Sequence, residues 1–435
     1  MTTLDLAPTM PAAPRRWEDA GLSADLILQI VTKTLHFAGE LRGTELAARL
    51  GVPFFVIEPT LELLKTERHC EIVGGSLVGA PAYTYRLTDS GRVRAALFLE
   101  DNHYVGALPV PLEQYQAYMA RFAAQHSVEV TRELVKVAFS HLVLNRRVLD
   151  QLGPAIAAWH SLFIYGPPGN GKTVIAQAIR NVLHGELAIP HALSVEGHIV
   201  RLFDPVNHER VDEDPDEAGL EEHHPFDRRW VRCRRPLVTV GGELTLNALE
   251  LGYSEAFGFY TAPLQALANG GVLLIDDFGR QAASPRDLLN RWIVPLESRV
   301  DYLTLRTGQK FELPFNVFVV FATNIKPSEL VDEAFLRRIQ YKVLAESPTP
   351  AEFTEIFRNY CASKQLPFES SIADYVITKE IRPRGINMRG CHPRDLIEHA
   401  LAIAKYLDQP RQLTTSLLSE ACASYFVEDR DVASA

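Results

Sequence analysis

Eight consecutive residues have the types and spacing that hold a polyphosphate. They match the pattern GxxxxGK[ST], and they are Gly166, Pro167, Pro168, Gly169, Asn170, Gly171, Lys172 and Thr173. The glycines allow the backbone to curl so that its N–H groups point inward at phosphate oxygens. Lys172 can reach the β- and γ-phosphates of a nucleotide, and the Thr173 hydroxyl can bind Mg²⁺. The motif therefore predicts a site for a nucleotide and a magnesium ion.

The sequence on either side of this loop predicts the elements that position it. Residues 161–165 form an apolar run typical of a buried strand, and residues 174–179 have the pattern of a helix. A helix after the loop adds its positive N-terminal end to the phosphate site. The alternative is a Gly/Pro-rich turn that matches the pattern by chance. The motifs that follow argue against that alternative.

Two carboxylates follow a second apolar strand. Residues 271–275 are predicted as a buried strand, and Asp276 and Asp277 come directly after it. Beside a phosphate loop, a carboxylate at the end of a strand can bind Mg²⁺, mainly through water. We predict that role for Asp276, and we predict that Asp277 orients or polarises the attacking water. The alternative is a strand that simply ends in an Asp-Asp turn.

Four further polar side chains have positions suited to a bound nucleotide. Asn324 ends another apolar strand and can hydrogen-bond the γ-phosphate or the water beside it. Arg337 and Arg338 follow a predicted helix over 328–335, and one of them can stabilise transition-state charge on a neighbouring subunit's nucleotide. The alternative is that one arginine caps its own helix, where a cation is favourable. Arg394 lies near the start of a later helix and can fold over the phosphates.

In this order along the chain, the motifs resemble those of the AAA+ ATPases, over residues 132–427. The corresponding motifs are Walker A at 166–173, Walker B at 275–277, sensor 1 at Asn324, the arginine finger at Arg337 or Arg338, and sensor 2 at Arg394. The resemblance implies an α/β fold with a doubly wound parallel sheet, a C-terminal helical lid and an oligomeric ring, usually a hexamer. It implies ATP and Mg²⁺ as cofactors. Where this chain has Asp277 the family usually has Glu, so hydrolysis here is expected to be slower or to need a closer geometry.

A narrower resemblance concerns the long stretch between the two halves of the nucleotide site, where an insertion is predicted near 197–245. Residues 256–263 resemble the aromatic-glycine substrate loop of bacterial enhancer-binding activators. Its aromatic residues are Phe257, Phe259 and Tyr260. Residues 302–313 alternate around a Thr-Gly turn and predict a hairpin, similar to the one before sensor 1 in a large AAA+ branch. For the three aromatic side chains, packing in the core is an equally good interpretation.

Residues 20–105 resemble a winged-helix domain of the α+β class. Ser23 is predicted to cap the first helix, whose apolar face contains Leu26, Ile27, Ile30, Val31 and Phe37. Thr44 is predicted to cap a short second helix. A third helix is expected within 53–68, interrupted or kinked at Pro59. A strand that runs into a fourth helix follows over 83–92.

The charges of this domain decide between DNA and protein as its partner. Its third helix offers Glu58 and Glu62 against Lys65 and Arg68. A helix that faces phosphates needs cationic or amide side chains, and carboxylates are repelled there. We therefore favour a protein substrate or adaptor as the partner of residues 20–105, with DNA as the alternative.

A charged stretch lies within the predicted insertion. An acidic tract over 212–217, followed by Glu221, Glu222, His223 and His224, precedes Arg228, Arg229, Arg232, Arg234 and Arg235. The arginines can contact nucleic acid or a neighbour's nucleotide, but ion pairs with the acidic tract are the preferred interpretation. A metal site in the tract is conceivable, and a solvated loop is preferred.

Length and composition set the broad class. The chain has 435 residues, which suggests two or three domains, and its 47% hydrophobic and 23% charged residues are those of a globular protein. The net charge of −10 does not favour a nucleic-acid binder. No run is long enough to span a membrane, and the five scattered cysteines lack a CxxC pair, so we expect no zinc site and a cytoplasmic location.

The predicted domain boundaries follow from these motifs. They are a disordered tail over 1–19, the winged helix over 20–105, a linker and helix over 106–131, the nucleotide-binding core over 132–345, a helical lid over 346–428 and a tail over 429–435.

Three functions fit the motifs. The first is an ATP-driven ring motor that remodels a protein substrate, in the manner of a chaperone. The second is a DNA-linked ATPase, either a transcription activator or a replication-type loader. The third is an assembly switch that is gated by nucleotide and hydrolyses slowly. The acidic third helix and the net charge favour the first over the second.

Overall fold

The computed structural model describes residues 10–74, 79–125, 130–211, 225–330 and 336–426. The chain divides into two compact units, each built from segments that are distant in sequence. The first unit contains Met1–Val128, Leu183–Leu273 and Ala282–Phe318. The second unit contains Glu129–Val182, Leu274–Gln281 and Val319–Ala435. All residues predicted to handle a nucleotide fall within the second unit.

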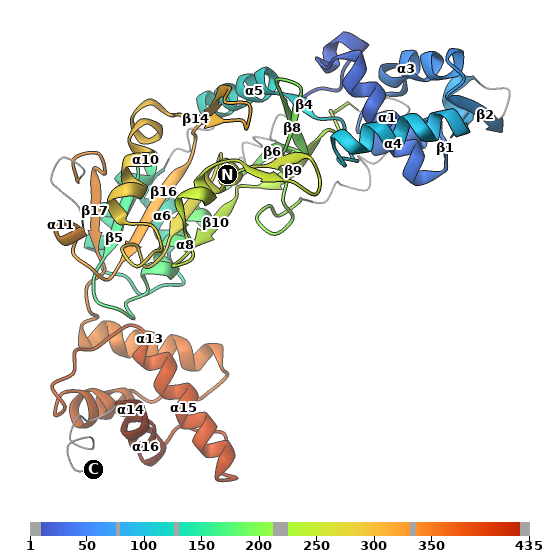
Figure 1. The fold of residues 1–435 in the computed structure, drawn as a ribbon. Coiled ribbons are helices and arrows are strands. Elements are labelled where there is room, and N and C mark those ends of the chain that lie inside the picture. The colour runs from blue at the N-terminus through green and yellow to red at the C-terminus, as the bar shows by residue number, and fades with distance from the viewer. Residues whose placement is uncertain (1–9, 75–78, 126–129, 212–224, 331–335, 427–435) are drawn as a thin grey trace, which may run out of the picture. The chain divides into compact units, whose positions relative to one another are not determined.

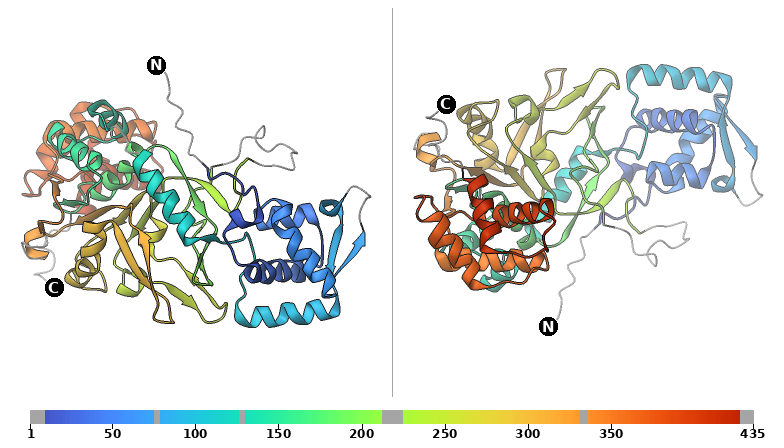
Figure 2. Two further views of the ribbon diagram at one scale, coloured as in Figure 1. Left: turned by 90° about the horizontal axis from the view of Figure 1, so that it is seen from above. Right: turned by 90° about the horizontal axis from the view of Figure 1, so that it is seen from below.

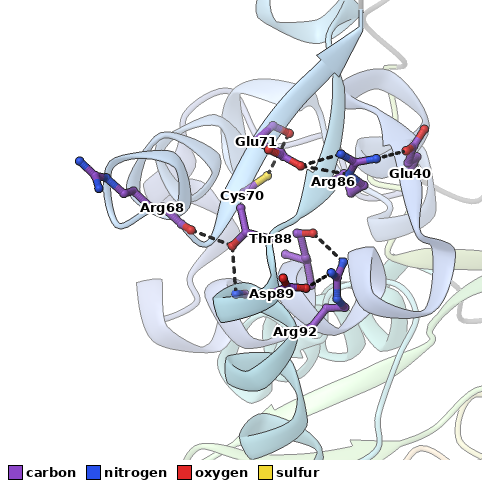
Figure 3. Close-up of polar contacts among 10 residues, drawn as sticks. Glu40, Arg68, Cys70, Glu71, Arg86, Thr88, Asp89 and Arg92 are labelled. Carbon is purple, nitrogen blue, oxygen red and sulfur yellow. Dashed lines mark hydrogen bonds and ion pairs between the residues drawn. The ribbon is translucent and has the colours of Figure 1, made fainter.

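The N-terminal part of the first unit combines helices with a three-stranded antiparallel sheet of order β1-β3-β2 (Figure 1). Its elements are η1 (Trp17–Ala20), α1 (Ala24–Ala38), β1 (Glu40–Arg42), α2 (Gly43–Leu50), α3 (Phe54–Thr66), β2 (Cys70–Gly74), η2 (Ala80–Ala82), β3 (Thr84–Leu87) and α4 (Asp89–Asp101). Arg86 on the central strand pairs with Glu40 on β1 at 3.0 Å and with Glu71 on β2 at 2.7 Å (Figure 3). One guanidinium group thus bridges all three strands.

The starts of two helices show one confirmed prediction and one error. Ser23 caps α1, because its hydroxyl accepts the N–H of Leu26 at 3.2 Å. The predicted cap at Thr44 is wrong, since α2 begins at Gly43 and has no side-chain cap of that kind. The N–H of Gly43 donates to the Tyr83 carbonyl at 3.0 Å. That bond continues the pairing of β1 with β3 and thereby sets where the helix begins.

Two further predictions about these helices are corrected. Leu26, Ile27, Ile30 and Val31 are buried as expected, but Phe37 is 63% exposed, in the last turn of α1. The interruption expected at Pro59 is absent, since α3 runs unbroken from Phe54 to Thr66. Pro59 is exposed, so water can reach the carbonyl that loses its helical hydrogen bond.

The rest of the first unit is mainly β structure. Its elements are β4 (Val110–Pro111), α5 (Leu112–Gln125), β6 (Glu186–Pro190), β7 (Ala192–Val195), β8 (His198–Arg201), β9 (Trp230–Arg234), η3 (Leu246–Leu249), β11 (Gly252–Ser254), β12 (Phe259–Thr261), α9 (Leu264–Leu267), α10 (Pro285–Ser298), β14 (Val300–Thr304) and β15 (Lys310–Pro314). One sheet has the order β11-β12-β8-β7-β4, while β6 pairs with β9 and β14 with β15. The β14–β15 hairpin confirms the prediction over 302–313, and Gly308 at its turn has φ +84°.

Residues 106–111, predicted as a linker, are instead built into the first unit. Val110 and Pro111 form β4 and pair in parallel with Leu193 and Ser194 of β7. The side chains of Leu108 and Val110 are fully buried. Apolar side chains at these positions therefore draw the segment into the core, and the prediction of a linker over 106–111 is wrong.

A five-stranded sheet of order β10-β13-β16-β5-β17 positions the nucleotide motifs. Its strands are β5 (Leu162–Tyr165), β10 (Leu237–Val240), β13 (Val272–Ile275), β16 (Phe318–Thr323) and β17 (Tyr341–Leu344). β5 pairs in parallel with both β16 and β17. β13 and β16 are buried along their whole length, which explains their continuous apolar runs. β5 comes first in the chain yet lies between later strands, and α/β sheets bind ligands at such a reversal of strand order.

Helices complete the second unit. Beside the sheet, its helices are α6 (Arg132–Ala138), α7 (Arg146–Ala157), α8 (Lys172–Val182) and α11 (Pro327–Leu330). The C-terminal group, called the lid below, consists of α13 (Pro350–Ser363), α14 (Ser370–Tyr375), the π-helical turn η4 (Val376–Ile381), α15 (His392–Tyr406) and α16 (Thr415–Tyr425) (Figures 1 and 2). The lid has its own apolar core, which includes Phe353, Phe357 and Leu418. The α/β fold and the C-terminal helices agree with the prediction.

The described residues can be compared with what the sequence suggested about membrane-spanning segments and about the cysteines. None of the helices in those ranges has the length and apolar character of a transmembrane segment. All five cysteines are free thiols, and four of them are buried.

The arginine-rich stretch makes ion pairs within the first unit. Arg229 pairs with Asp227 at 2.8 Å, Arg232 with Glu186 at 2.5 Å and Arg234 with Glu209 at 3.4 Å. Residues 212–224, which include the acidic tract, lie outside the described residues. Their pairing with the arginines stays a prediction.

Arg229 joins three parts of the first unit. Its side chain is 1% exposed and that of Asp227 is 4% exposed, so both charges are withdrawn from water. The guanidinium also donates to the carbonyl of Ala20 at 2.8 Å, the carbonyl of Pro109 at 3.4 Å and Oε1 of Gln114 at 3.1 Å. The N-terminal part, the segment before β4 and helix α5 therefore meet at one buried cation.

We predict that Arg229→Ala lowers the free energy of unfolding by about 3–5 kcal/mol, because it leaves Asp227 buried without its partner. Arg234→Ala is the matched control, since its pair with Glu209 is exposed and should contribute at most about 1 kcal/mol. Urea unfolding followed by tryptophan fluorescence measures both variants. Equal small losses in the two variants would contradict the central position of Arg229.

Candidate active site

The loop between β5 and α8 has the shape of a phosphate cradle. Gly166, Gly169 and Gly171 have φ values of +143°, +81° and +74°, which side chains rarely permit. The first N–H groups of α8 have no acceptor within the helix and are directed at whatever lies beyond its N-terminus. The predicted strand, loop and helix are all present, and they supply backbone donors for an anion.

Lys172 is held at the centre of the loop. It is 7% exposed, and its ammonium donates to the carbonyls of Gly166 at 3.0 Å and Pro167 at 2.9 Å and to Oδ1 of Asn324 at 2.5 Å. Burial lowers the pKa of Lys172, while the Asp277 and Asp276 carboxylates oppose this effect. The lysine thus sits on the loop with acceptors that a phosphate oxygen can replace.

Thr173 and Asp276, the predicted magnesium ligands, are brought together. The Thr173 hydroxyl donates to Oδ2 of Asp276 at 2.7 Å. Hydroxyl and carboxylate oxygens are the ligands that Mg²⁺ prefers, and the ion usually completes its shell with water and nucleotide phosphates. Within the described ranges, no cluster of three or more His, Cys, Asp or Glu side chains could hold a metal by itself. The Thr173 hydroxyl and the Asp276 carboxylate are donors that fit Mg²⁺ bound together with nucleotide phosphates.

Asp277 and Asn324 form a second pair beside the lysine. Nδ2 of Asn324 donates to Oδ1 of Asp277 at 3.0 Å, so one amide connects Lys172 with Asp277. The backbone of Asp277 is left-handed, with φ +49°, and its N–H donates to Oδ1 of Asp276 at 3.0 Å. Asp and Asn tolerate this conformation better than most side chains. That preference gives a local reason for Asp at this position.

Arg337 and Arg338 lie in the turn before β17. Arg337 is exposed and Arg338 is half-buried. The ammonium of Lys342 fixes this turn by donating to the carbonyls of Leu336 and Ile339, each at 2.7 Å. The helix predicted over 328–335 begins as α11, and residues 331–335 lie outside the described residues. The role of either arginine on a neighbouring nucleotide stays a prediction.

The first turn of α15 places Arg394 differently from expectation. Its side chain is 62% exposed and pairs with the adjacent Asp395 at 2.8 Å. Two backbone groups just before it contact the phosphate loop instead. The N–H of Cys391 donates to the Gly169 carbonyl at 2.8 Å, and the N–H of Gly390 donates to Oδ1 of Asn170 at 3.2 Å.

Sequence reasoning missed these contacts between the phosphate loop and the lid. Asn170 and Gly390 are 220 positions apart, and backbone donors leave no mark on side-chain patterns. The one available signal was Gly390 itself. An ideal Cβ at this position would lie 3.3 Å from the Gly169 carbonyl oxygen, which is a tight contact.

The predicted aromatic loop is the turn between β11 and β12 in the first unit. Phe257 is 54% exposed, Phe259 is half-buried and Tyr260 is 2% exposed, so the first is presented and the last belongs to the core. The carbonyl of Phe257 accepts the N–H of His103 at 2.8 Å, just after α4. Core packing is therefore confirmed for Tyr260, while a substrate role for this turn stays a prediction, and the turn is attached to the N-terminal part.

Comparison with known proteins gives two partial family matches. Residues 141–200 match the family of magnesium chelatase, subunit ChlI, and residues 349–424 match a domain of unknown function, DUF8689. The first match covers β5, the phosphate loop and α8, and the second covers the lid. Among curated proteins, none matches this chain.

Solved structures show distant likenesses. The RuvB Holliday junction branch migration motor of Thermotoga maritima is 14% identical with a TM-score of 0.38, over 71% of this chain and 74% of that chain. NtrX from Brucella abortus in complex with ATP is 14% identical with a TM-score of 0.40, over 66% of this chain and 57% of that chain. Scores and identities this low say nothing about function. The chain combines an α/β fold, whose five-stranded sheet carries a loop of the phosphate-binding pattern, with a group of C-terminal helices.

We predict that Lys172→Ala weakens the binding of magnesium-ATP by roughly 10- to 100-fold, because a charged hydrogen-bond donor to phosphate is lost. Isothermal titration calorimetry on the purified chain measures the affinity. Lys136→Ala on α6, where the lysine is exposed, is the matched control and should bind like the unchanged protein. Unchanged affinity in Lys172→Ala would contradict a phosphate site at this loop.

Proposed function

We propose that this chain binds and hydrolyses ATP, with Mg²⁺, at the loop between β5 and α8. The observation that carries the proposal is one connected set of side chains. Lys172 meets Asn324, Asn324 meets Asp277, and the Thr173–Asp276 pair lies beside them. A charged donor for phosphate, oxygen ligands for Mg²⁺ and a carboxylate for water are the groups that phosphoryl transfer requires.

Each residue has a separate task in this proposal. The loop N–H groups and Lys172 bind the phosphates, and Thr173 with Asp276 holds Mg²⁺, which neutralises charge on the phosphate oxygens. Asp277 accepts a hydrogen bond from the attacking water and orients it. Asn324 fixes Asp277 and is placed to donate to the γ-phosphate or its water. Arg394 belongs to the lid and is expected to approach the phosphates once its bond to Asp395 is exchanged.

We propose that the ATPase works as a ring, expected to be a hexamer, and that it remodels a protein substrate or complex. The N-terminal part, with α1, α2 and α3 and the strands β2 and β3, is proposed to be a winged helix that docks the partner. Several of its cations, on α3, β3 and α4, are paired with carboxylates, which supports a protein partner. Lys65 pairs with Glu62 at 2.8 Å, Arg86 with Glu40 and Glu71, and Arg92 and Arg94 with Asp89 and Glu67.

DNA remains the second candidate partner. Its recognition by α3 would place Glu58 and Glu62 against phosphates, and the nearest cation, Lys65, is already paired with Glu62. Carboxylates at that position oppose duplex binding. The charge pattern therefore ranks the protein partner first.

We predict that Asp277→Asn keeps magnesium-ATP binding but lowers turnover by about 10²- to 10⁴-fold, the usual contribution of a general base. Asn fits the left-handed backbone of position 277, so the geometry should survive the change. Steady-state phosphate release is measured beside nucleotide affinity. Turnover like that of the unchanged protein would show that Asp277 has no part in hydrolysis.

We predict that the Arg337→Ala/Arg338→Ala double variant loses activity on the order of 10³- to 10⁵-fold, the range expected for an arginine finger. The test mixes this variant with Lys172→Ala subunits. If the arginines act on a neighbour, the mixture contains interfaces with an intact loop and intact arginines, and activity partly returns. Co-purification of the untagged subunit with an affinity-tagged one verifies that mixed assemblies form.

Two outcomes would contradict this role. One is full activity of the double-arginine variant by itself. The other is no recovery in any mixture in which mixed assemblies are demonstrated.

A further inference from the structure

We propose that Asn170 couples the phosphate loop to the lid and to the segment that leads into the lid. This inference rests on the proposed function, because it assigns a regulatory contact to the same loop. Asn170 stands between Gly169 and Gly171 and is 9% exposed. Its amide contacts Ala345 and Gly390, whereas Lys172 contacts Asn324 and Thr173 contacts Asp276.

The amide of Asn170 uses both of its ends. Nδ2 donates to the carbonyl of Ala345 at 3.2 Å, and Ser347 Oγ lies 3.5 Å from the same nitrogen. Residues 345–349 connect β17 to α13, so this end of the amide holds the start of the lid segment. Oδ1 accepts the N–H of Gly390 at 3.2 Å, in the turn before α15. One side chain therefore contacts the connection to the lid and the lid itself.

The backbone beside Asn170 reinforces the contact. The Gly169 carbonyl accepts the N–H of Cys391 at 2.8 Å. An ideal Cβ at Gly169 would lie 2.6 Å from Sγ of Cys391, so the thiol packs directly over the glycine. If the phosphate loop changes shape when it binds a phosphate, the Gly169 carbonyl and the Asn170 amide must move. The turn before α15, called the lid turn below, is bonded to both groups through Cys391 and Gly390.

His392 connects the lid turn to the rest of the lid. Nδ1 of the buried His392 accepts the N–H of Arg389 at 3.3 Å, and its ring packs against Tyr425 and Phe426. Burial lowers the pKa of His392 to about 4, so the ring is neutral near pH 7 and Nδ1 is free to accept. Motion passed to Gly390 and Cys391 therefore reaches α15 and α16.

The accessibility of Cys391 reports on the contact between the phosphate loop and the lid turn. Cys391 is half-buried against Gly169, whereas Cys361 and Cys422 are buried in the lid core. Release of the lid turn from the loop exposes Cys391 alone. Loss of lid structure exposes Cys361 and Cys422 as well.

The experiment measures the rate at which a maleimide modifies each cysteine of the full chain without nucleotide, by mass spectrometry of peptides. We expect Asn170→Ala to raise the rate at Cys391 roughly tenfold, because two hydrogen bonds are lost. Asn170→Asp keeps an acceptor for Gly390 but loses the donor to Ala345, so we expect an intermediate rate. Gln177→Ala on α8, where the amide is exposed, is the matched control and should leave the rate unchanged.

The outcomes separate this proposal from its alternatives. An unchanged rate at Cys391 in Asn170→Ala overturns it, and so does an equal rise at Cys361 and Cys422, which indicates a loosened lid. Failure of the unchanged protein to bind magnesium-ATP contradicts the proposed function, and it does so in a separate measurement. Lower turnover at saturating ATP in Asn170→Ala, with KM changed less than kcat, is the expected effect on the reaction.

Discussion

The buried ammonium of Lys172 is the interaction on which the site depends. A cation that is 7% exposed must be surrounded by acceptors, since an isolated buried charge is strongly unfavourable. Two carbonyls of the loop and the amide of Asn324 provide them, and both strands that carry these groups, β5 and β16, are paired in parallel. The pairing of β5 with β16 therefore determines where the Lys172 ammonium lies. The hydrogen bonds that the ammonium donates then determine the conformation of the phosphate loop.

The same constraint explains why the acidic residues are where they are. Asp276 and Asp277 end a fully buried strand, and their carboxylates favour the charged form of the lysine against the effect of burial. The left-handed backbone at Asp277 turns its side chain toward Asn324. Positive charge on the loop and negative charge on the strand end thus stabilise one another without a ligand, and this charge arrangement suits the magnesium–phosphate group of the proposed function.

Features with a local cause could be predicted from the sequence. The strand, loop and helix around Lys172 depend on a short apolar run and on glycines, and the hairpin over 302–313 depends on alternation and one turn. Contacts between distant segments had no such signal. The bond of Asn170 to Gly390 joins residues 220 positions apart, and that of Arg229 to Ala20 joins residues 209 apart. The start of α2 was missed for the same reason, because the Gly43 N–H bonds to the distant Tyr83 carbonyl.

Three hydrogen bonds attach the N-terminal part to the rest of the first unit. They are the physical route by which a partner bound to the N-terminal part can act on that unit. The Leu50 carbonyl accepts the N–H of Leu108, Arg229 binds the Ala20 carbonyl, and the Phe257 carbonyl accepts the N–H of His103. At Gly258 an ideal Cβ would lie 2.4 Å from the Asp101 carbonyl oxygen, so the aromatic turn and the end of α4 are in direct contact. Tyr260 anchors the other side of this turn by pairing with Val200. A displacement of Phe257 must therefore break its bond to His103 or move the segment that directly follows α4.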